Sequence, residues 1–243
     1  MGVPHGLVDA LRNCRRLCVL TGSGISAESG VPTFREAQTG LWARFDPHEL
    51  ATPEAFSRDP ALVWRWYRWR RELIGKVRPN AAHRALARLA DMLPDLTLIT
   101  QNVDGLHQQA GSRGVIEFHG NIFQNRCFAE TTLVEHADLS PEVPKCPACG
   151  AALRPGVVWF GESIPATALD AATMAVQRCD LFIAIGTSAL VWPAGGFAEL
   201  ARENAALVVE VNPDDTPLTP IANYALRGKA GVVLPELVDC LTR

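Results

Sequence analysis

The chain carries a glycine-rich segment directly after an apolar run, an arrangement suited to holding phosphate groups. Gly22-Ser23-Gly24-Ile25-Ser26-Ala27 satisfies the pattern G-x-G-x-x-[GA] and follows the run Leu17–Thr21. Such glycines allow a tight turn and let backbone N–H groups approach a pyrophosphate. A standard dinucleotide-dependent dehydrogenase would add a second strand ending in an acidic residue about 20 positions on. The following region, GLWARFDPHELATP, holds no apolar strand. The sequence therefore favours a dinucleotide site whose second half is rebuilt, and argues against hydride transfer.

Three of the seven cysteines have metal-ligand spacing. Cys146 and Cys149 form a C-x-x-C knuckle, and Cys127 lies 19 positions before it. A structural zinc site built from two knuckles requires a fourth thiolate three positions after Cys127, but that position is Glu130. Three hypotheses stay open: zinc held by three thiolates plus Glu130, His136 or water; a degenerate metal site; and a redox pair. We favour structural zinc, because no thioredoxin-like βαβ unit flanks the knuckle.

Apolar runs and helical patterns predict the elements that must position these groups. Runs without polar alternation are typical of parallel strands buried on both faces. The predicted strands are Leu17–Thr21, Leu96–Thr100, Leu181–Gly186 and Leu207–Asn212, with a shorter one at Val115–His119. The predicted helices are Asn80–Leu93, Pro165–Arg178 and Gly195–Asn204, the first with Asn80 as its N-cap. This alternation predicts an α/β fold with a Rossmann-like, mostly parallel sheet and ligands beyond the carboxyl ends of its strands.

Two stretches interrupt the alternation. Residues 40–77 are aromatic, arginine-rich and helical in character, whereas residues 121–154 are polar and contain the cysteine cluster. We expect these insertions to form a small helical and zinc-knuckle-like module. Residues 1–39, 78–120 and 155–243 would then form the Rossmann-like domain that binds the dinucleotide.

Composition limits the function classes. The chain has 243 residues, 48% of them hydrophobic and 20% charged, with a formal net charge of -3. An acidic balance gives no general field for nucleic acid or anionic lipid. No apolar run approaches the ~18–20 residues of a membrane helix, and the start of the chain does not read as a signal peptide. We expect a cytoplasmic protein that binds neither nucleic acid nor membrane and, lacking heptads or an obvious apolar edge, is a monomer.

Several ordered motifs, taken together, closely resemble the sirtuins, which are NAD-dependent protein deacylases. They span about Leu17 to Pro235. The matching blocks are GSGISAESGVPTFR, Gln101-Asn102-Val103-Asp104, Phe118-His119-Gly120, Val157-Val158-Trp159-Phe160-Gly161-Glu162, Gly186-Thr187-Ser188 and Val211-Asn212-Pro213.

The resemblance implies the reaction and its base. The nicotinamide–ribose bond of NAD would break, and the acyl group of an acylated protein lysine would pass to ADP-ribose. The products would be deacylated lysine, nicotinamide and 2′-O-acyl-ADP-ribose. His119 would be the general base that activates a ribose hydroxyl, and an ordinary histidine pKa of about 6.5 suits that task. Zinc, where bound, would be structural.

The resemblance also assigns the NAD site. Ser26, Ile25, Asn102 and Asp104 would line the nicotinamide pocket, and Phe34 would shield the ribose from water. The full expected set is Gly22, Ser23, Gly24, Ile25, Ser26, Ala27, Glu28, Thr33, Phe34, Arg35, Gln101, Asn102, Val103, Asp104, Gly186, Thr187, Ser188, Asn212, Pro213, Asp214 and Ala230.

The segment WRWYRWRREL is unusual in its arginines and aromatics. In a helix, Tyr67 and Arg70 are three positions apart and share a face. The segment resembles the helix of class III sirtuins in which Tyr-x-x-Arg lines the acyl pocket. A guanidinium takes a carboxylate bidentately, and a phenol adds a donor. The resemblance therefore implies a preference for succinyl- and malonyl-lysine, with acetyl-lysine a poorer or parallel substrate. Val157, Trp159 and Phe160 would pair with the substrate peptide as an added strand.

Two other functions are weighed against this one. The first keeps the NAD site but transfers ADP-ribose to protein, and Tyr67 and Arg70 favour deacylation over it. The second is a non-enzymatic zinc-knuckle module that binds nucleic acid. The acidic balance and the lack of a basic, aromatic patch around Cys127–Cys149 argue against that hypothesis.

Overall fold

The computed structural model describes residues 2–31, 50–93 and 95–242. Within these residues a six-stranded sheet has the order β3-β2-β1-β6-β7-β8, and every neighbouring pair is parallel. Its strands are β1 (Leu17–Thr21), β2 (Leu96–Thr100), β3 (Ile116–Glu117), β6 (Leu181–Ile185), β7 (Leu207–Asn212) and β8 (Tyr224–Arg227). The predicted α/β fold with a Rossmann-like sheet is confirmed.

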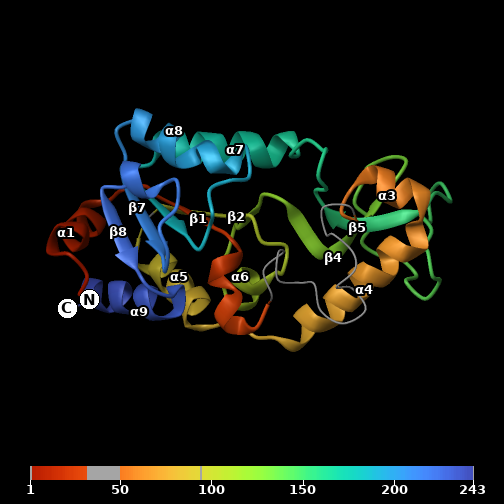
Figure 1. The fold of residues 1–243 in the computed structure, drawn as a ribbon, viewed down its shortest axis with the longest axis horizontal. Helices are drawn as coiled ribbons and strands as arrows, with labels where there is room; N and C mark the ends of the chain where they lie inside the picture. The colour runs from red at the N-terminus through yellow and green to blue at the C-terminus, as the bar shows by residue number, and fades with distance from the viewer. Residues whose placement is uncertain (1, 32–49, 94, 243) are drawn as a thin grey trace.

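Both faces of the sheet are covered by helices (Figure 1). One layer contains α1 (His5–Asn13), α5 (Ala81–Met92) and α9 (Ala230–Thr242), and the other contains α7 (Ala166–Arg178) and α8 (Phe197–Glu203). Short turns complete this part of the chain: α6 (Leu106–Gln109), η1 (Ser23–Ile25), η2 (Ala27–Ser29), η4 (Ala194–Gly196) and η5 (Thr219–Ile221). Among the described residues, no helix has both the length and the apolar character needed to cross a membrane.

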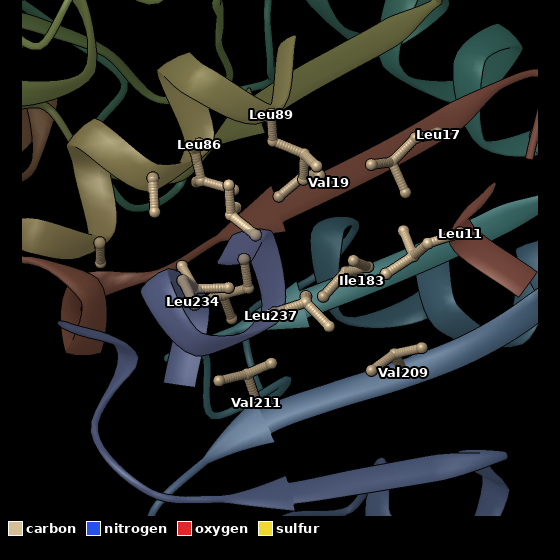
Figure 2. Packing of buried hydrophobic residues seen from close by; sticks show 14 of the residues in the cluster. Leu11, Leu17, Val19, Leu86, Leu89, Ile183, Val209, Val211, Leu234 and Leu237 are labelled. Carbon is tan, nitrogen blue, oxygen red and sulfur yellow. The ribbon is translucent and has the colours of Figure 1, made fainter. Parts of the chain in front are cut away.

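Side chains of β1 alternate between two separate cores. Leu17 and Val19 lie in the core under α1, α5 and α9, whereas Cys18 and Leu20 lie in the core under α7 and α8. Figure 2 shows Leu86 and Leu89 of α5 and Leu234 and Leu237 of α9 packed over Val19, Ile183, Val209 and Val211. Because both faces are apolar and buried, the strand reads as one continuous apolar run.

A smaller unit lies at the end of the molecule opposite the two termini (Figure 1). Strands β4 (Gly120–Cys127) and β5 (Leu153–Val157) form an antiparallel pair beside α3 (Pro53–Arg58) and α4 (Pro60–Lys76). They enclose a third core that contains Phe56, Trp64, Trp66, Tyr67 and Trp159. The division at residues 40–77 and 121–154 stays a prediction.

Most of the arginines of α4 fasten this unit together. Arg71 donates to the carbonyl of Ile122 at 2.6 Å, and Arg68 donates to that of Leu139 at 2.9 Å. Arg65 pairs with Glu142 at 2.8 Å. The arginine-rich helix therefore holds the polar insertion against itself, chiefly through main-chain carbonyls.

Candidate active site

The glycine-rich segment packs directly onto the end of β6. The N–H of Gly22 donates to the carbonyl of Ile185 at 3.0 Å, and that of Gly24 donates to the carbonyl of Gly186 at 2.9 Å. Gly186 has a φ of +57°, and a Cβ there would lie 2.6 Å from the backbone nitrogen of Ile25. The close approach therefore excludes side chains at this point. The following residues form the single 3₁₀ turns η1 and η2, which agrees with a binding loop rather than a long helix.

A buried polar cluster lies where β1 and β2 end. Ser26 Oγ donates to Asp104 Oδ2 at 2.7 Å, and Asn102 Nδ2 lies 3.2 Å from Ser26 Oγ and 3.0 Å from the carbonyl of Gly22. Ser26 and Asp104 are 1% and 4% exposed. Burial raises the pKa of the Asp104 carboxyl, and hydrogen bonds from the Leu106 backbone and Ser26 partly offset that effect. The structure thus brings together three of the residues expected around nicotinamide.

Two buried histidines support this cluster, a role that the sequence does not indicate beyond capping and packing. His83 Nε2 lies 3.4 Å from Ser26 Oγ, and His107 Nε2 lies 2.9 Å from Thr21 Oγ1. The two rings are 4.9 Å apart. Burial lowers the pKa of His83 to about 4 and that of His107 to about 3, so both imidazoles are neutral near pH 7. His83 also completes the cap of α5 with Asn80.

His119 is held in one orientation by the main chain. Its Nδ1 lies 3.0 Å from the carbonyl of Gln101. A carbonyl oxygen only accepts hydrogen bonds, so Nδ1 carries the proton and Nε2 carries the lone pair of the neutral ring. Burial lowers the pKa of His119, and the hydrogen bond with Gln101 partly offsets this. The ring is thus prepared to accept a proton at Nε2.

Polar groups also converge at the ends of β6 and β7. Gln101 Nε2 donates to Thr187 Oγ1 at 2.9 Å, and Asn212 Nδ2 donates to the carbonyl of Thr187 at 3.0 Å. Glu28 accepts from the backbone N–H of Gly231 at 2.7 Å, which ties the loop after β1 to the first turn of α9 beside Ala230. Gln101, Thr187 and Asn212 thus link the residues at the carboxyl ends of β2, β6 and β7.

The other expected cofactor contacts fall into two groups. Those within the described residues lie in the same loops and strand ends; they are Ser23, Ala27, Val103, Ser188, Pro213 and Asp214. Thr33, Phe34 and Arg35 lie outside the described residues.

Tyr67 and Arg70 meet on α4. Arg70 Cζ lies 6.0 Å from the centroid of the Tyr67 ring and 4.9 Å from that of Trp66. The Tyr67 hydroxyl accepts from Trp159 Nε1 at 2.8 Å. Burial lowers the pKa of Arg70, and its electrostatic interactions with Tyr67 and Asp104 partly offset that effect. Since the Asp104 charge acts on Arg70, this face of α4 lies within electrostatic range of the buried polar cluster.

The backbone beyond β5 is already bonded within the chain. The N–H groups of Val158 and Phe160 donate to the carbonyls of His119 and Ala51, both at 2.9 Å. The carbonyls of Val157 and Trp159 also accept within the chain, from Arg154 at 2.6 Å and from the N–H of Glu162 at 3.1 Å. The pairing of a substrate peptide with Val157, Trp159 and Phe160 stays a prediction.

Sequence reasoning missed a buried ion pair in this segment. The guanidinium of Arg154, 4% exposed, pairs with both carboxylate oxygens of Glu162 and stacks on Trp159 with Cζ 3.4 Å from the ring centroid. A signal was available: an arginine inside the apolar run of LRPGVVWF needs a buried partner, and Glu162 follows shortly after it.

The three cysteines gather as their spacing predicts. The sulfur atoms of Cys127, Cys146 and Cys149 all lie within 4.8 Å of one another, and those of Cys127 and Cys149 are 3.5 Å apart. Cys127 and Cys146 are buried, whereas Cys149 is exposed. Thiolates at such distances suit zinc, so the cluster fits a structural zinc ion. Among the described side chains, neither Glu130 nor His136 joins this group, and the fourth ligand stays a prediction.

A parallel α/β sheet with a glycine loop and convergent polar groups at the carboxyl ends of its strands defines a dinucleotide-binding protein. A model of the Sir2 family matches residues 22–193, and the chain belongs to that family. The expected sirtuin resemblance is thus confirmed.

Relatives and solved structures agree over almost the whole chain. NAD-dependent protein deacylase 1 of Archaeoglobus fulgidus is 50% identical over 96% of this chain and 95% of its own length. The NAD-dependent protein deacylase of Aquifex aeolicus is 52% identical over 93% of this chain and 95% of its own length. The crystal structure of a Sir2 homologue–NAD complex has a TM-score of 0.92 and 47% identity, and covers 99% of this chain and 94% of that one. The structure of a mutant Sir2 homologue in complex with 2′-O-acetyl ADP ribose has a TM-score of 0.91 and 49% identity. It covers 99% of this chain and 97% of that one.

Proposed function

We propose that the protein removes acyl groups from protein lysines with NAD, and that it prefers acyl groups ending in a carboxylate. NAD-dependent deacylation follows from the family, because the chain is an NAD-dependent protein deacylase of the Sir2 type. The preference for acidic acyl groups is supported by Tyr67 and Arg70, which meet on one face of α4 within electrostatic range of Asp104.

The donor set at the strand ends fits NAD. The loop Gly22–Ala27 would hold the pyrophosphate, and Asn102, Asp104 and Ser26 would take the nicotinamide amide and its surroundings. NAD supplies a ribose carbon that accepts the acyl oxygen as nicotinamide leaves. Buried, fixed dipoles around that carbon stabilise developing charge more strongly than water does.

His119 would move the proton that the transfer requires. Nδ1 donates to the Gln101 carbonyl, so Nε2 is the atom that takes the proton of a ribose hydroxyl. That hydroxyl oxygen would bond to the acyl carbon, the lysine nitrogen would leave that carbon as the free amine, and one water molecule would supply the acyl oxygen that replaces the one left on the ribose, giving 2′-O-acyl-ADP-ribose. The lowered pKa of His119 keeps this base neutral at pH 7.

An acidic acyl group would meet two donors on α4. The Arg70 guanidinium offers paired N–H groups, and the Tyr67 phenol offers one O–H. A succinyl or malonyl chain ends in the carboxylate that these donors recognise, whereas an acetyl chain does not.

Arg70→Met tests this preference. We expect the ratio of kcat/KM for succinyl- over acetyl-lysine peptide to fall by about 10- to 150-fold, because a hydrogen bond to a charged group is worth about 1.5–3 kcal/mol. The measurement is peptide deacylation by mass spectrometry with NAD in excess. Arg65→Met is the matched control, since its guanidinium is half exposed and pairs with Glu142. Equal losses on both peptides would show that Arg70 does not read the acyl charge.

A further inference from the structure

We propose that Trp159 and Arg154 are positioning residues for acyl selectivity: they hold the Tyr67 hydroxyl so that its proton is directed to the carboxylate of an acidic acyl group. This inference rests on the proposed acidic-acyl preference and adds residues that do not contact the acyl carboxylate themselves.

The direction of the Tyr67 proton follows from hydrogen-bond chemistry. Indole nitrogen carries a hydrogen and only donates. The 2.8 Å bond between Trp159 Nε1 and the Tyr67 oxygen therefore makes that oxygen the acceptor. The phenol has a single hydrogen, which must point away from Trp159. Burial also raises the pKa of Tyr67 to about 12, so the phenol keeps this hydrogen at neutral pH.

Trp159 is itself fixed from two sides. Its backbone N–H donates to Glu162 Oε2 at 2.7 Å, and its ring lies against the guanidinium of Arg154. Arg154 is held in turn by Glu162 and by the carbonyl of Val157 at 2.6 Å. All three side chains of this chain of contacts, those of Arg154, Trp159 and Tyr67, are at least 95% buried. The ring that orients Tyr67 thus has little freedom to turn.

The consequence concerns selectivity. A Tyr67 hydroxyl without its fixed donor could rotate or accept from another group, and would offer a weaker bond to a carboxylate. An acetyl group has no terminal oxygen to accept that bond, so it gains nothing from the orientation. Loss of the Trp159 N–H should therefore act on the acidic substrate through KM more than through kcat.

Trp159→Phe is the primary test, because it keeps an aromatic ring and removes the N–H. We expect the succinyl-to-acetyl ratio of kcat/KM to fall about three- to tenfold, the range for one neutral hydrogen bond. Any common effect on peptide binding cancels in the ratio. In a Tyr67→Phe background the same substitution should change the ratio no further, since the hydroxyl is already gone.

Two further variants complete the experiment. Trp64→Phe removes an equivalent buried bond, from Trp64 Nε1 to the Leu153 carbonyl at 2.7 Å in the same core, and should leave the ratio unchanged. Arg154→Lys keeps the charge but loses the planar stack, and should lower the ratio without deleting the indole; it serves as the second route should Trp159→Phe fail to fold.

The outcomes separate this inference from the proposed function. An unchanged ratio in Trp159→Phe and Arg154→Lys would overturn the inference. So would an equal fall with and without the Tyr67 hydroxyl, or an equal fall in Trp64→Phe. Arg70→Met assayed alongside tests the acidic preference itself, so its failure is seen independently of the Trp159 result.

Discussion

At the scale of single residues, the site depends on hydrogen-bond partners that can only donate or only accept. Each such partner fixes the position of a proton on its neighbour. The Gln101 carbonyl assigns the proton of His119 to Nδ1, and the Trp159 N–H makes the Tyr67 oxygen an acceptor. In each case a partner with a single role determines where the reactive atom of its neighbour points. Such partners are not visible in a motif, because the partner atom often belongs to the main chain or to a distant segment.

The pH dependence of catalysis tests the state of His119. Burial disfavours the charged imidazolium, so the pKa lies below the ordinary value of 6.5. The neutral base then persists as the pH falls, and the acidic limb of kcat/KM for succinyl peptide should have its midpoint below 6.5. His119→Ala should reduce kcat by about 100- to 10,000-fold, measured by steady-state release of deacylated peptide.

His5→Ala is the control for this experiment, because His5 is exposed at the start of α1. It should leave both the rate and the pH profile unchanged. Undiminished turnover in His119→Ala would contradict the assignment of the base.

Part of the candidate site could be predicted from sequence, and part could not. Gly22, Asn102, Asp104 and His119 stand in ordered motifs, so their convergence follows once the strand ends are known. His83 and His107 gave no such signal, because lone histidines on helices usually pack or cap. Their place behind Ser26 depends on how α5 and α6 meet the loop after β1.

At the scale of elements, the end of β6 and the loop after β1 form one packed unit. Gly186→Ala should shift that loop, because the new Cβ would lie 2.6 Å from the backbone nitrogen of Ile25. We expect the KM for NAD to rise at least about tenfold and the protein to lose more than about 1–2 kcal/mol, the cost of left-handed backbone alone. Urea unfolding and NAD titration measure the two effects.

Gly114→Ala separates strain from crowding. Gly114 has a nearly equal φ of +61°, and nothing lies within 4 Å of its Cβ position. Gly114→Ala should lower the free energy of unfolding by the cost of left-handed backbone and leave NAD binding unaffected. Equal effects of the two substitutions on NAD binding would show that the close approach is not what shapes the loop.

Most residues of the predicted strands are buried, but burial did not reveal every strand, because all five residues of β5 are buried and β5 was not predicted. Strands β1, β2 and β7 have the predicted bounds, and Asn80 caps α5 as expected, because covered faces and caps leave local patterns. The strand β8 was missed: its residues are half-buried or exposed and form no apolar run. The predicted strand at Val115–His119 is shorter, Ile116–Glu117, since the chain turns toward the site before His119.

At the scale of the whole molecule, the chain builds two covered sheet faces and a third core at the far end. Cys127 and Cys146 lie in that third core with Trp64, Trp66 and Trp159, and Cys149 is exposed beside them, whereas most of the dinucleotide groups lie at the ends of the parallel strands. A metal there would therefore act on stability and on the shape of the small unit, with the reacting atoms elsewhere.

Metal analysis tests the cluster. Protein purified without added zinc should contain about one zinc ion per chain, and removing it with a chelator should lower the melting temperature and shift tryptophan fluorescence. Cys146→Ala should reproduce the loss, whereas Cys240→Ala, at a distant cysteine on α9, should not. Substoichiometric zinc in fully folded protein would contradict the prediction of a structural zinc site.

The central claim is that breakage of NAD is coupled to removal of an acyl group from lysine. The most direct measurement incubates the protein with matched succinyl-, malonyl- and acetyl-lysine peptides, with and without NAD, and quantifies nicotinamide and deacylated peptide. We predict equal amounts of the two products, formed only when both substrates are present and fastest for the acidic peptides. Deacylation without NAD, or nicotinamide release that needs no acylated peptide, would contradict it, the latter indicating ADP-ribosyl transfer.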